Sequence, residues 1–173
     1  MKLNVKKLVI SSAVFSALLY GSAHAAEPKL IGEHGDWAAY MFMENNNKVC
    51  YMVSQPKKTS GNYTKRGEVY ALVTHRPAKK KKNVFSYISG YTYKPGSEVT
   101  VTVNNQNFRL FTQDDSAWAS DEATDNKITD SIKRGSSLVV KGASSRGTET
   151  VDTFGLGGSS SAYKAISSEC GVK

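Results

Sequence analysis

Short runs of apolar and β-branched residues alternate with polar turns along most of this chain. Residues 99–103 read Val-Thr-Val-Thr-Val, which places the valines on one face of a strand and the threonines on the other. Residues 37–43 are instead apolar at nearly every position, which predicts a strand covered on both faces. Strands are expected at residues 37–43, 49–53, 68–74, 83–93, 99–103, 108–111, 138–140 and 148–156. Their close spacing predicts an all-β fold, an antiparallel β-sandwich of roughly eight strands.

Two short helices are expected beside these strands. Residues 121–134 begin with acidic side chains and end with Lys133 and Arg134, which is the charge polarity that a helix prefers. In the closing stretch, the hydroxyls of residues 159–161 can cap a second helix. Its apolar face is formed by residues spaced three and four apart, namely Ala162, Tyr163, Ile166 and Cys170.

The first 25 residues are typical of a secretory signal peptide. Three lysines precede an apolar run at residues 8–19, and the small-x-small sequence Ala23-His24-Ala25 follows the run. Because the run is short for a bilayer span, an uncleaved membrane anchor is the less favoured alternative. We expect cleavage to leave residues 26–173 as a single domain without a transmembrane segment, located in the periplasm, on the outer membrane or outside the cell.

Cysteine usage fits this oxidising location. The only two cysteines are Cys50 and Cys170, and an exported protein most simply joins such a pair in one intramolecular disulfide. The bond would tie the C-terminal helix to the first strands. Thiol catalysis is disfavoured because the chain has no C-x-x-C motif.

Basic residues gather in the first half of the expected domain. The 23 basic and 15 acidic residues give a formal charge of +8; three of the lysines and none of the acids precede residue 26, which leaves +5. This excess favours an anionic surface of the envelope or of a host cell, and export argues against nucleic acid. The alternative is a solvated loop that keeps an edge strand soluble. The candidate residues for an anionic partner are Lys57, Lys58, Lys65, Arg66, Arg76, Lys79, Lys80, Lys81, Lys82 and Arg146.

Arg146 belongs to a separate segment, Ser144-Ser145-Arg146-Gly147-Thr148. Hydroxyls around one arginine can hold a carboxylate or a phosphate through charge-assisted hydrogen bonds. Equally, Arg146 can pair with Asp152 or Glu149 and fix a hairpin. The composition is that of a turn, which favours the structural interpretation.

No pattern in the chain is sufficient for catalysis. Ser161 and Lys164 have the S-x-x-K spacing of some serine acyl transferases, but no K-T-G motif follows them. His34 and His75 are the only histidines after residue 25, no G-x-S-x-G occurs, and two separate imidazoles leave a metal site short of ligands. We therefore expect no enzyme activity, no metal and no cofactor. His75, next to Arg76, would instead add charge to the basic cluster on acidification.

Four segments together are similar to a known family. They are GDWAAY around Trp37, KVCYMVSQPKK at residues 48–58, VYALVTHRP at residues 69–77, and the long stretch at residues 139–166. In combination they resemble the invasion-associated locus B family of exported alphaproteobacterial proteins, across essentially all of residues 26–173. The resemblance implies a small envelope protein without agreed catalytic residues or cofactor. In some blood-borne members it also implies a part in entry into host red cells.

Three functions follow as hypotheses. The first is a non-enzymatic envelope protein that contributes to host-cell interaction or invasion by binding an anionic surface or partner. The second is a periplasmic housekeeping protein that binds client proteins along an exposed sheet edge. The third and least favoured is a small hydrolase that uses Ser161.

Overall fold

The computed structural model of this protein describes residues 27–173, so the expected signal peptide lies outside the described part. Eleven antiparallel strands form one continuous open sheet in the order β1-β2-β3-β5-β6-β9-β8-β7-β10-β11-β4. The strands are β1 (Lys29–His34), β2 (Trp37–Glu44), β3 (Asn47–Ser54), β4 (Lys58–Gly61), β5 (Tyr70–Arg76), β6 (Lys81–Ile88), β7 (Glu98–Val103), β8 (Gln106–Gln113), β9 (Ser116–Trp118), β10 (Ser137–Ala143) and β11 (Glu149–Gly155). The helices are α1 (Glu122–Arg134), α2 (Ser159–Cys170) and a short 3₁₀ helix, η1 (Pro77–Lys79).

The all-β class and the two helices are confirmed, but the expected sandwich of roughly eight strands is corrected. One sheet of eleven strands replaces two separate sheets. Three strands were not predicted because they lack a regular apolar pattern. β1 contains a bulge next to Gly32, all four residues of β4 are exposed, and β9 has only three residues. The expected strand at residues 83–93 is too long, because β6 ends at Ile88 and Gly90 turns the chain with φ +71°.

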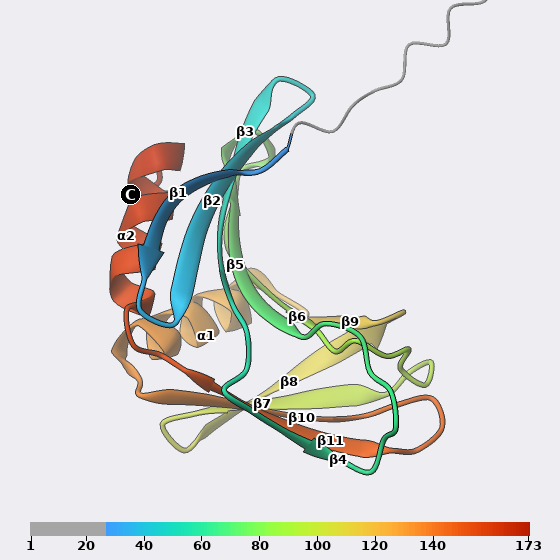
Figure 1. Cartoon of the computed structure of the whole chain (residues 1–173). Helices are drawn as coiled ribbons and strands as arrows, with labels where there is room; N and C mark the ends of the chain where they lie inside the picture. The colour runs from blue at the N-terminus through green and yellow to red at the C-terminus, as the bar shows by residue number, and fades with distance from the viewer. Residues whose placement is uncertain (1–26) are drawn as a thin grey trace, which may run out of the picture.

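The sheet bends so that its two halves face each other. In Figure 1 the half that contains β1, β2, β3 and β5 stands upright, and the half that contains β7, β8, β10, β11 and β4 lies nearly horizontal below it. Two hydrogen bonds join the halves: Trp37 Nε1 donates to the Gly155 carbonyl at 3.1 Å, and the Asp36 amide donates to the Gly157 carbonyl at 2.9 Å. The fold is therefore sandwich-like, although a single sheet supplies both layers.

Strand alternation places one face of each half in the shared core. On β7 the three valines are buried and the threonines between them are half-buried, as the Val-Thr pattern predicts. The largest fully buried side chains include Trp37, Tyr87, Phe85 and Phe154, which come from both halves. Burial of this apolar surface is the main favourable term in the folding free energy.

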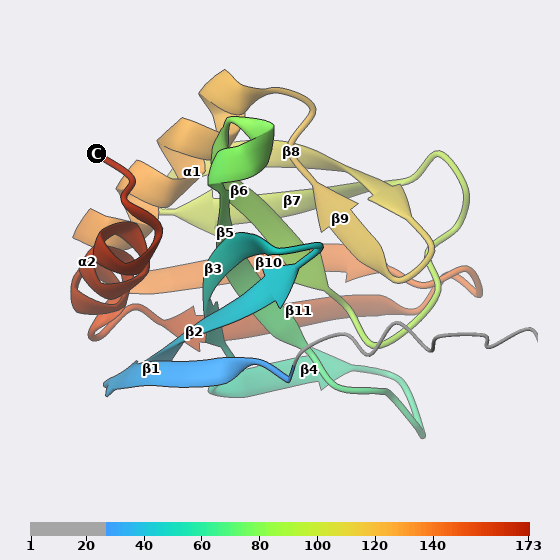
Figure 2. The same cartoon turned by 90° about the horizontal axis from the view of Figure 1, so that it is seen from above.

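Both helices cover one end of this core (Figure 2). The side chain of Asp121 caps α1 by accepting a 2.8 Å hydrogen bond from the Thr124 amide, and Ile128 and Ile132 are fully buried. The expected hydroxyl cap of α2 is wrong, because the N-cap is Gly158 at φ +86° without a side-chain hydrogen bond. Ser159 instead donates to the Ile132 carbonyl at 2.9 Å, which joins the two helices.

An ion pair closes the other end of the interior, where the loop between β4 and β5 crosses from one half to the other (Figure 1). Arg66 of this loop donates to both carboxylate oxygens of Asp152, at 2.8 and 2.7 Å, and to the Ser89 carbonyl at 2.6 Å. The two side chains are only 5% and 0% exposed. Burial opposes the charged guanidinium, but the hydrogen bonds to Asp152 raise the pKa of Arg66 above its ordinary value. Tyr87 of β6 also donates to Asp152, so the cluster joins β6, β11 and the loop.

Replacement of Asp152 by Asn should destabilise the fold strongly, since it leaves the Arg66 charge buried without its counter-ion. We expect the free energy of unfolding to fall by about 3–5 kcal/mol in urea denaturation. Glu98→Gln is the matched control, because it removes a carboxylate from the exposed pair of Glu98 with Arg109 and should leave the midpoint nearly unchanged. Equal losses for the two variants would contradict a special role of the buried pair.

Candidate functional site

The turn between β5 and β6 presents a run of lysines, and we call residues 76–82 the lysine hairpin. Pro77 starts η1, the Lys80 amide donates to the Pro77 carbonyl at 2.8 Å, and Lys80 adopts a left-handed conformation at φ 52°. Lys79, Lys80, Lys81 and Lys82 are all exposed. A hydrogen-bonded turn with a proline at its start holds these ammonium groups close together without folding them against the sheet.

Acidic neighbours neutralise only part of the lysine hairpin. Glu44 accepts hydrogen bonds from Arg76 and lies 3.1 Å from Lys79, and these contacts lower the pKa of Glu44. Lys82 donates to the Lys173 carbonyl at 3.4 Å. Within residues 27–173, the ammonium groups of Lys80 and Lys81 have neither a hydrogen bond nor an ion pair. These two charges are therefore available to an external anion.

The other predicted basic residues do not join this hairpin. Lys57 pairs with Asp36 at 2.5 Å, and Lys58 lies on the edge strand β4. Figure 2 shows the short helix between β5 and β6 on the opposite side of the molecule from β4, and Figure 1 agrees. The fold thus separates the two groups of basic residues.

Arg66 does not present its charge at the surface, because its guanidinium is buried against Asp152. Lys65 and Arg146 do lie together, beside a hollow of about 370 Å³ that Ser144 and Ser145 also line. The polar groups of this turn are used within the protein, however. Ser144 Oγ accepts from the Thr148 amide at 3.2 Å, and the Gly147 amide donates to the Ser144 carbonyl at 2.8 Å. The turn is built to fix the β10–β11 connection, and an anion site there has few free donors.

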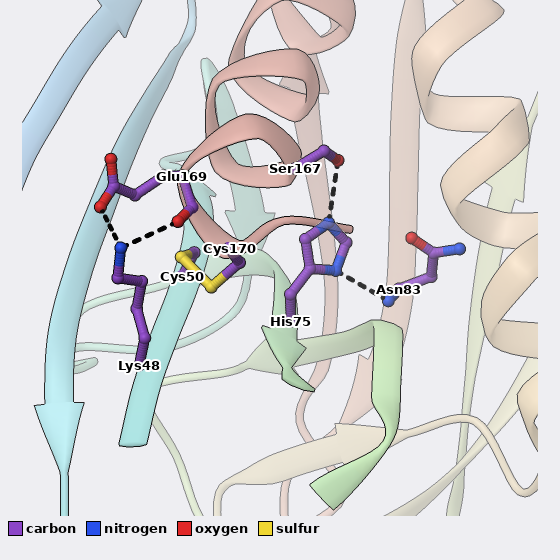
Figure 3. Close-up of a disulfide and its surroundings, with 7 residues drawn as sticks. All are labelled: Lys48, Cys50, His75, Asn83, Ser167, Glu169 and Cys170. Carbon is purple, nitrogen blue, oxygen red and sulfur yellow. Dashed lines mark hydrogen bonds and ion pairs between the residues drawn. A yellow bond between two sulfur atoms is a disulfide. The ribbon is translucent and has the colours of Figure 1, made fainter. Parts of the chain in front are cut away.

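A histidine and a serine meet at the C-terminal helix, as Figure 3 shows. His75 is fully buried on β5, and its Nε2 lies 3.1 Å from Ser167 Oγ. The Asn83 amide donates to His75 Nδ1 at 3.1 Å, so the proton of the neutral ring is at Nε2 and is donated toward Ser167. A ring in this tautomer cannot accept the serine proton, which a nucleophilic Ser–His pair requires.

Burial also lowers the pKa of His75 to about 4. The expectation that His75 adds charge to the basic cluster on mild acidification is therefore wrong. Ser161, the serine singled out in the sequence, is exposed on α2, and among the described residues no histidine or carboxylate is hydrogen-bonded to it. The His75–Ser167 contact positions α2 rather than activating a nucleophile.

The predicted disulfide is confirmed. Cys50 of β3 and Cys170 at the end of α2 are bonded, with their Cα atoms 6.0 Å apart and 120 positions apart in sequence. Figure 3 places the bond between the His75–Ser167 contact and the ion pair of Lys48 with Glu169, which is 2.8 Å long. In the chain-entropy account, closing a loop of this length raises the free energy of the unfolded chain by about 4–5 kcal/mol.

Residues 27–173 contain no group of three or more His, Cys, Asp or Glu side chains arranged to hold a metal ion. In that same part of the chain, no helix is both long enough and apolar enough to cross a bilayer.

Comparison with known proteins gives the family. The family described as "Invasion associated locus B (IalB) protein" matches residues 37–167, from the start of β2 into α2. The chain belongs to the IalB family. A solved structure, that of invasion associated protein B from Bartonella henselae, has the same fold, with a TM-score of 0.55, 13% identity, and coverage of 80% of this chain and 95% of that chain. No curated protein matches the chain.

The part that matches the IalB family includes the lysine hairpin, Arg66, Asp152 and Cys50, and it ends before Cys170. At 13% identity the Bartonella structure shows a common fold, and the resemblance stated from the sequence is confirmed at the level of the family.

Two buried groups, His75 and Asp125, change the stability of the fold in opposite directions as the pH falls from about 6.5 to 4. His75 stays neutral in the fold, so acidification from 6.5 toward 4 favours the unfolded chain. Burial raises the pKa of Asp125 from 3.8 to about 6, so acidification in that range favours the folded chain. Asp125 accepts from the Phe85 amide at 2.9 Å, a bond that an asparagine can keep.

Asp125→Asn should therefore change the pH dependence of stability. Near pH 7 the variant avoids a buried carboxylate and should gain about 1–3 kcal/mol in unfolding free energy. This gain should vanish as the pH falls to about 4, where the native carboxyl is protonated. Asp130→Asn on the same helix, where the carboxylate is half-exposed and paired with Lys133, is the control and should give a small, constant difference. Chemical denaturation at several pH values measures both, and a pH-independent effect of Asp125→Asn would show that its carboxyl titrates normally.

Proposed function

We propose that this protein is a non-catalytic binding protein of the bacterial envelope that engages an anionic surface through its lysine hairpin. The single observation that carries the proposal is the pair Lys80 and Lys81, held on an ordered turn with no acidic partner among residues 27–173. Each lysine near an anionic membrane contributes about 1 kcal/mol of attraction, and salt screens it within a Debye length.

Export and a role in host contact belong to the same proposal. The N-terminal sequence has the pattern of a secretory signal, and the disulfide fits an oxidising compartment. We place the protein in the periplasm or at the outer surface of the cell. Family membership and the name of the Bartonella protein favour a part in invasion, in which the anionic surface is that of the host cell.

A second candidate function, client-protein binding, is favoured by the open sheet. Among residues 27–173, β1 and β4 each pair with one neighbour only, which leaves on each an edge where an extended segment can add a strand. Strand addition depends on backbone hydrogen bonds, so partner capture that persists at high salt would favour this function. Lys58 on β4 reduces uncontrolled pairing at that edge.

The lysine hairpin can be tested with a charge-matched pair of double variants. Lys80→Gln with Lys81→Gln should weaken binding to lipopolysaccharide or to host-cell membranes about 30-fold at physiological salt. Lys58→Gln with Lys65→Gln removes the same charge elsewhere on the molecule and should change binding far less. Both proteins should melt within a few degrees of the native one, because these side chains are exposed. Equal weakening by the two variants would contradict a defined binding surface and leave only a net-charge effect.

A further inference from the structure

The outer surface of the sheet differs between its two halves. On the second half, outward residues such as Thr100, Thr102 and Lys141 are polar, with two valines, Val139 and Val151, among them. On the first half, and on β6, β9 and β8 next to it, most of them are aromatic or aliphatic. One row across the strands runs Tyr40, Tyr51, Thr74, Val84, and the next runs Val53, Leu72, Ser86, Trp118, Phe111. We call this surface, on β2, β3, β5, β6, β9 and β8, the outer apolar face.

Within residues 27–173 this face is only partly covered: most of its side chains are half-buried, and Glu27, Pro28 and the start of α1 border it. Both helices lie on the other side of the sheet, as Figure 1 shows, and their buried residues belong to the core. Leu30 and Phe111, at the two borders of the face, are 45% and 47% exposed. The sequence predicted that residues 37–43 would be covered on both sides; in the structure the Tyr40 side of β2 is half-buried, and Met43 on the other side is exposed. An antiparallel sheet can expose one face to solvent, but that face is usually polar. A contiguous apolar surface there indicates a binding site.

Two hollows on the face lead to the lysine hairpin. One, of about 470 Å³, is lined by Phe42, Tyr51 and Leu72, and the other, of about 440 Å³, by Val84, Phe111 and Trp118. Arg76 lines both hollows, and Lys81 and Lys82 line the second. Asp121, Glu122 and Asp125, at the start of α1, also line the second hollow, and the Asp121 carboxylate is held as the helix cap. Apolar contact area and cationic groups therefore meet along one border.

This combination selects the chemistry of the partner. A polyanionic glycan offers charge without apolar surface, and it would leave the aromatic rows exposed. A bilayer of anionic phospholipid offers both, since its phosphates lie a few ångströms from its acyl chains. Tyr and Trp rings prefer that depth, because they present an apolar body and a polar tip. Lysines beside such rings add attraction to anionic head groups.

We propose that the outer apolar face docks on an anionic phospholipid membrane, with Phe111 and Trp118 entering the acyl region and the lysine hairpin contacting phosphates. The proposal rests on the proposed function, because it uses the same hairpin. It adds that the surface bound is a lipid one and that binding has an apolar component that salt does not screen.

The two tryptophans give a direct readout. Trp37 is 1% exposed in the core, whereas Trp118 lies on the outer apolar face. Vesicles of phosphatidylglycerol and phosphatidylcholine in equal parts, with bromine on the acyl chains, should quench Trp118 fluorescence when the protein binds. Vesicles of phosphatidylcholine alone should bind weakly and quench little. Binding to the anionic vesicles without quenching would overturn the proposal.

Exposed-residue variants provide the second measurement. Leu30→Ser with Phe111→Ser should weaken binding to the anionic vesicles about tenfold. Met43→Ser is the control, since Met43 is 40% exposed but alternates to the other side of β2. Unchanged binding of the Leu30 and Phe111 variant would contradict apolar docking.

Soluble dextran sulfate distinguishes failure of this inference from failure of the proposed function. A protein that binds neither dextran sulfate nor anionic vesicles refutes both. A protein that binds both, without Trp118 quenching, refutes only the lipid docking. A dimer in sedimentation equilibrium that Leu30→Ser with Phe111→Ser dissociates, together with no vesicle binding, would assign the face to a second copy and also overturn the proposal.

Discussion

The arrangement of this fold depends on the buried ion pair between Arg66 and Asp152. The pair joins the β4–β5 loop to β11, and Tyr87 extends the cluster to β6. One end of the interior is filled by two helices, and this cluster fills the other. A buried charge is tolerated only with its partner in place, so the pair permits one approach of the two sheet halves and penalises others. A single sheet can thereby behave as a two-layered structure.

The disulfide acts in the same way at the other end. Cys50 and Cys170 fix the end of α2 to β3, and His75 with Ser167 and Lys48 with Glu169 surround the bond. With the interior closed at both ends, the apolar core lies on the inner side of the sheet. On the outer side, the lysine hairpin and the outer apolar face share a border at Arg76. The core and the proposed binding surface are thus opposite faces of the same strands.

Local patterns in the sequence predicted much of this structure. The Val-Thr alternation predicted the inward face of β7, the charge polarity predicted α1, and the two cysteines of a chain expected to be exported predicted the disulfide. The features that could not be predicted from the sequence depend on contacts between residues that are far apart in the chain. Arg66 and Asp152 are far apart in the chain, and nothing in the neighbourhood of Arg66 distinguishes it from the exposed Lys65. β4 forms from four exposed residues because β11 offers an edge, and the Gly158 cap follows from the close approach of the β1–β2 turn.

The arrangement of the basic residues in space could not be predicted for the same reason. Composition located the basic residues but could not show that the fold puts Lys58 and Lys81 on opposite sides.

The most direct test of membrane docking is acetylation of the lysines in the native protein, with and without phosphatidylglycerol-containing vesicles, read by mass spectrometry. The account predicts that Lys80 and Lys81 lose reactivity on the vesicles while Lys58, Lys65 and Lys141 keep theirs. Unchanged reactivity of Lys80 and Lys81 in vesicle-bound protein, or equal loss at all five lysines, would contradict it.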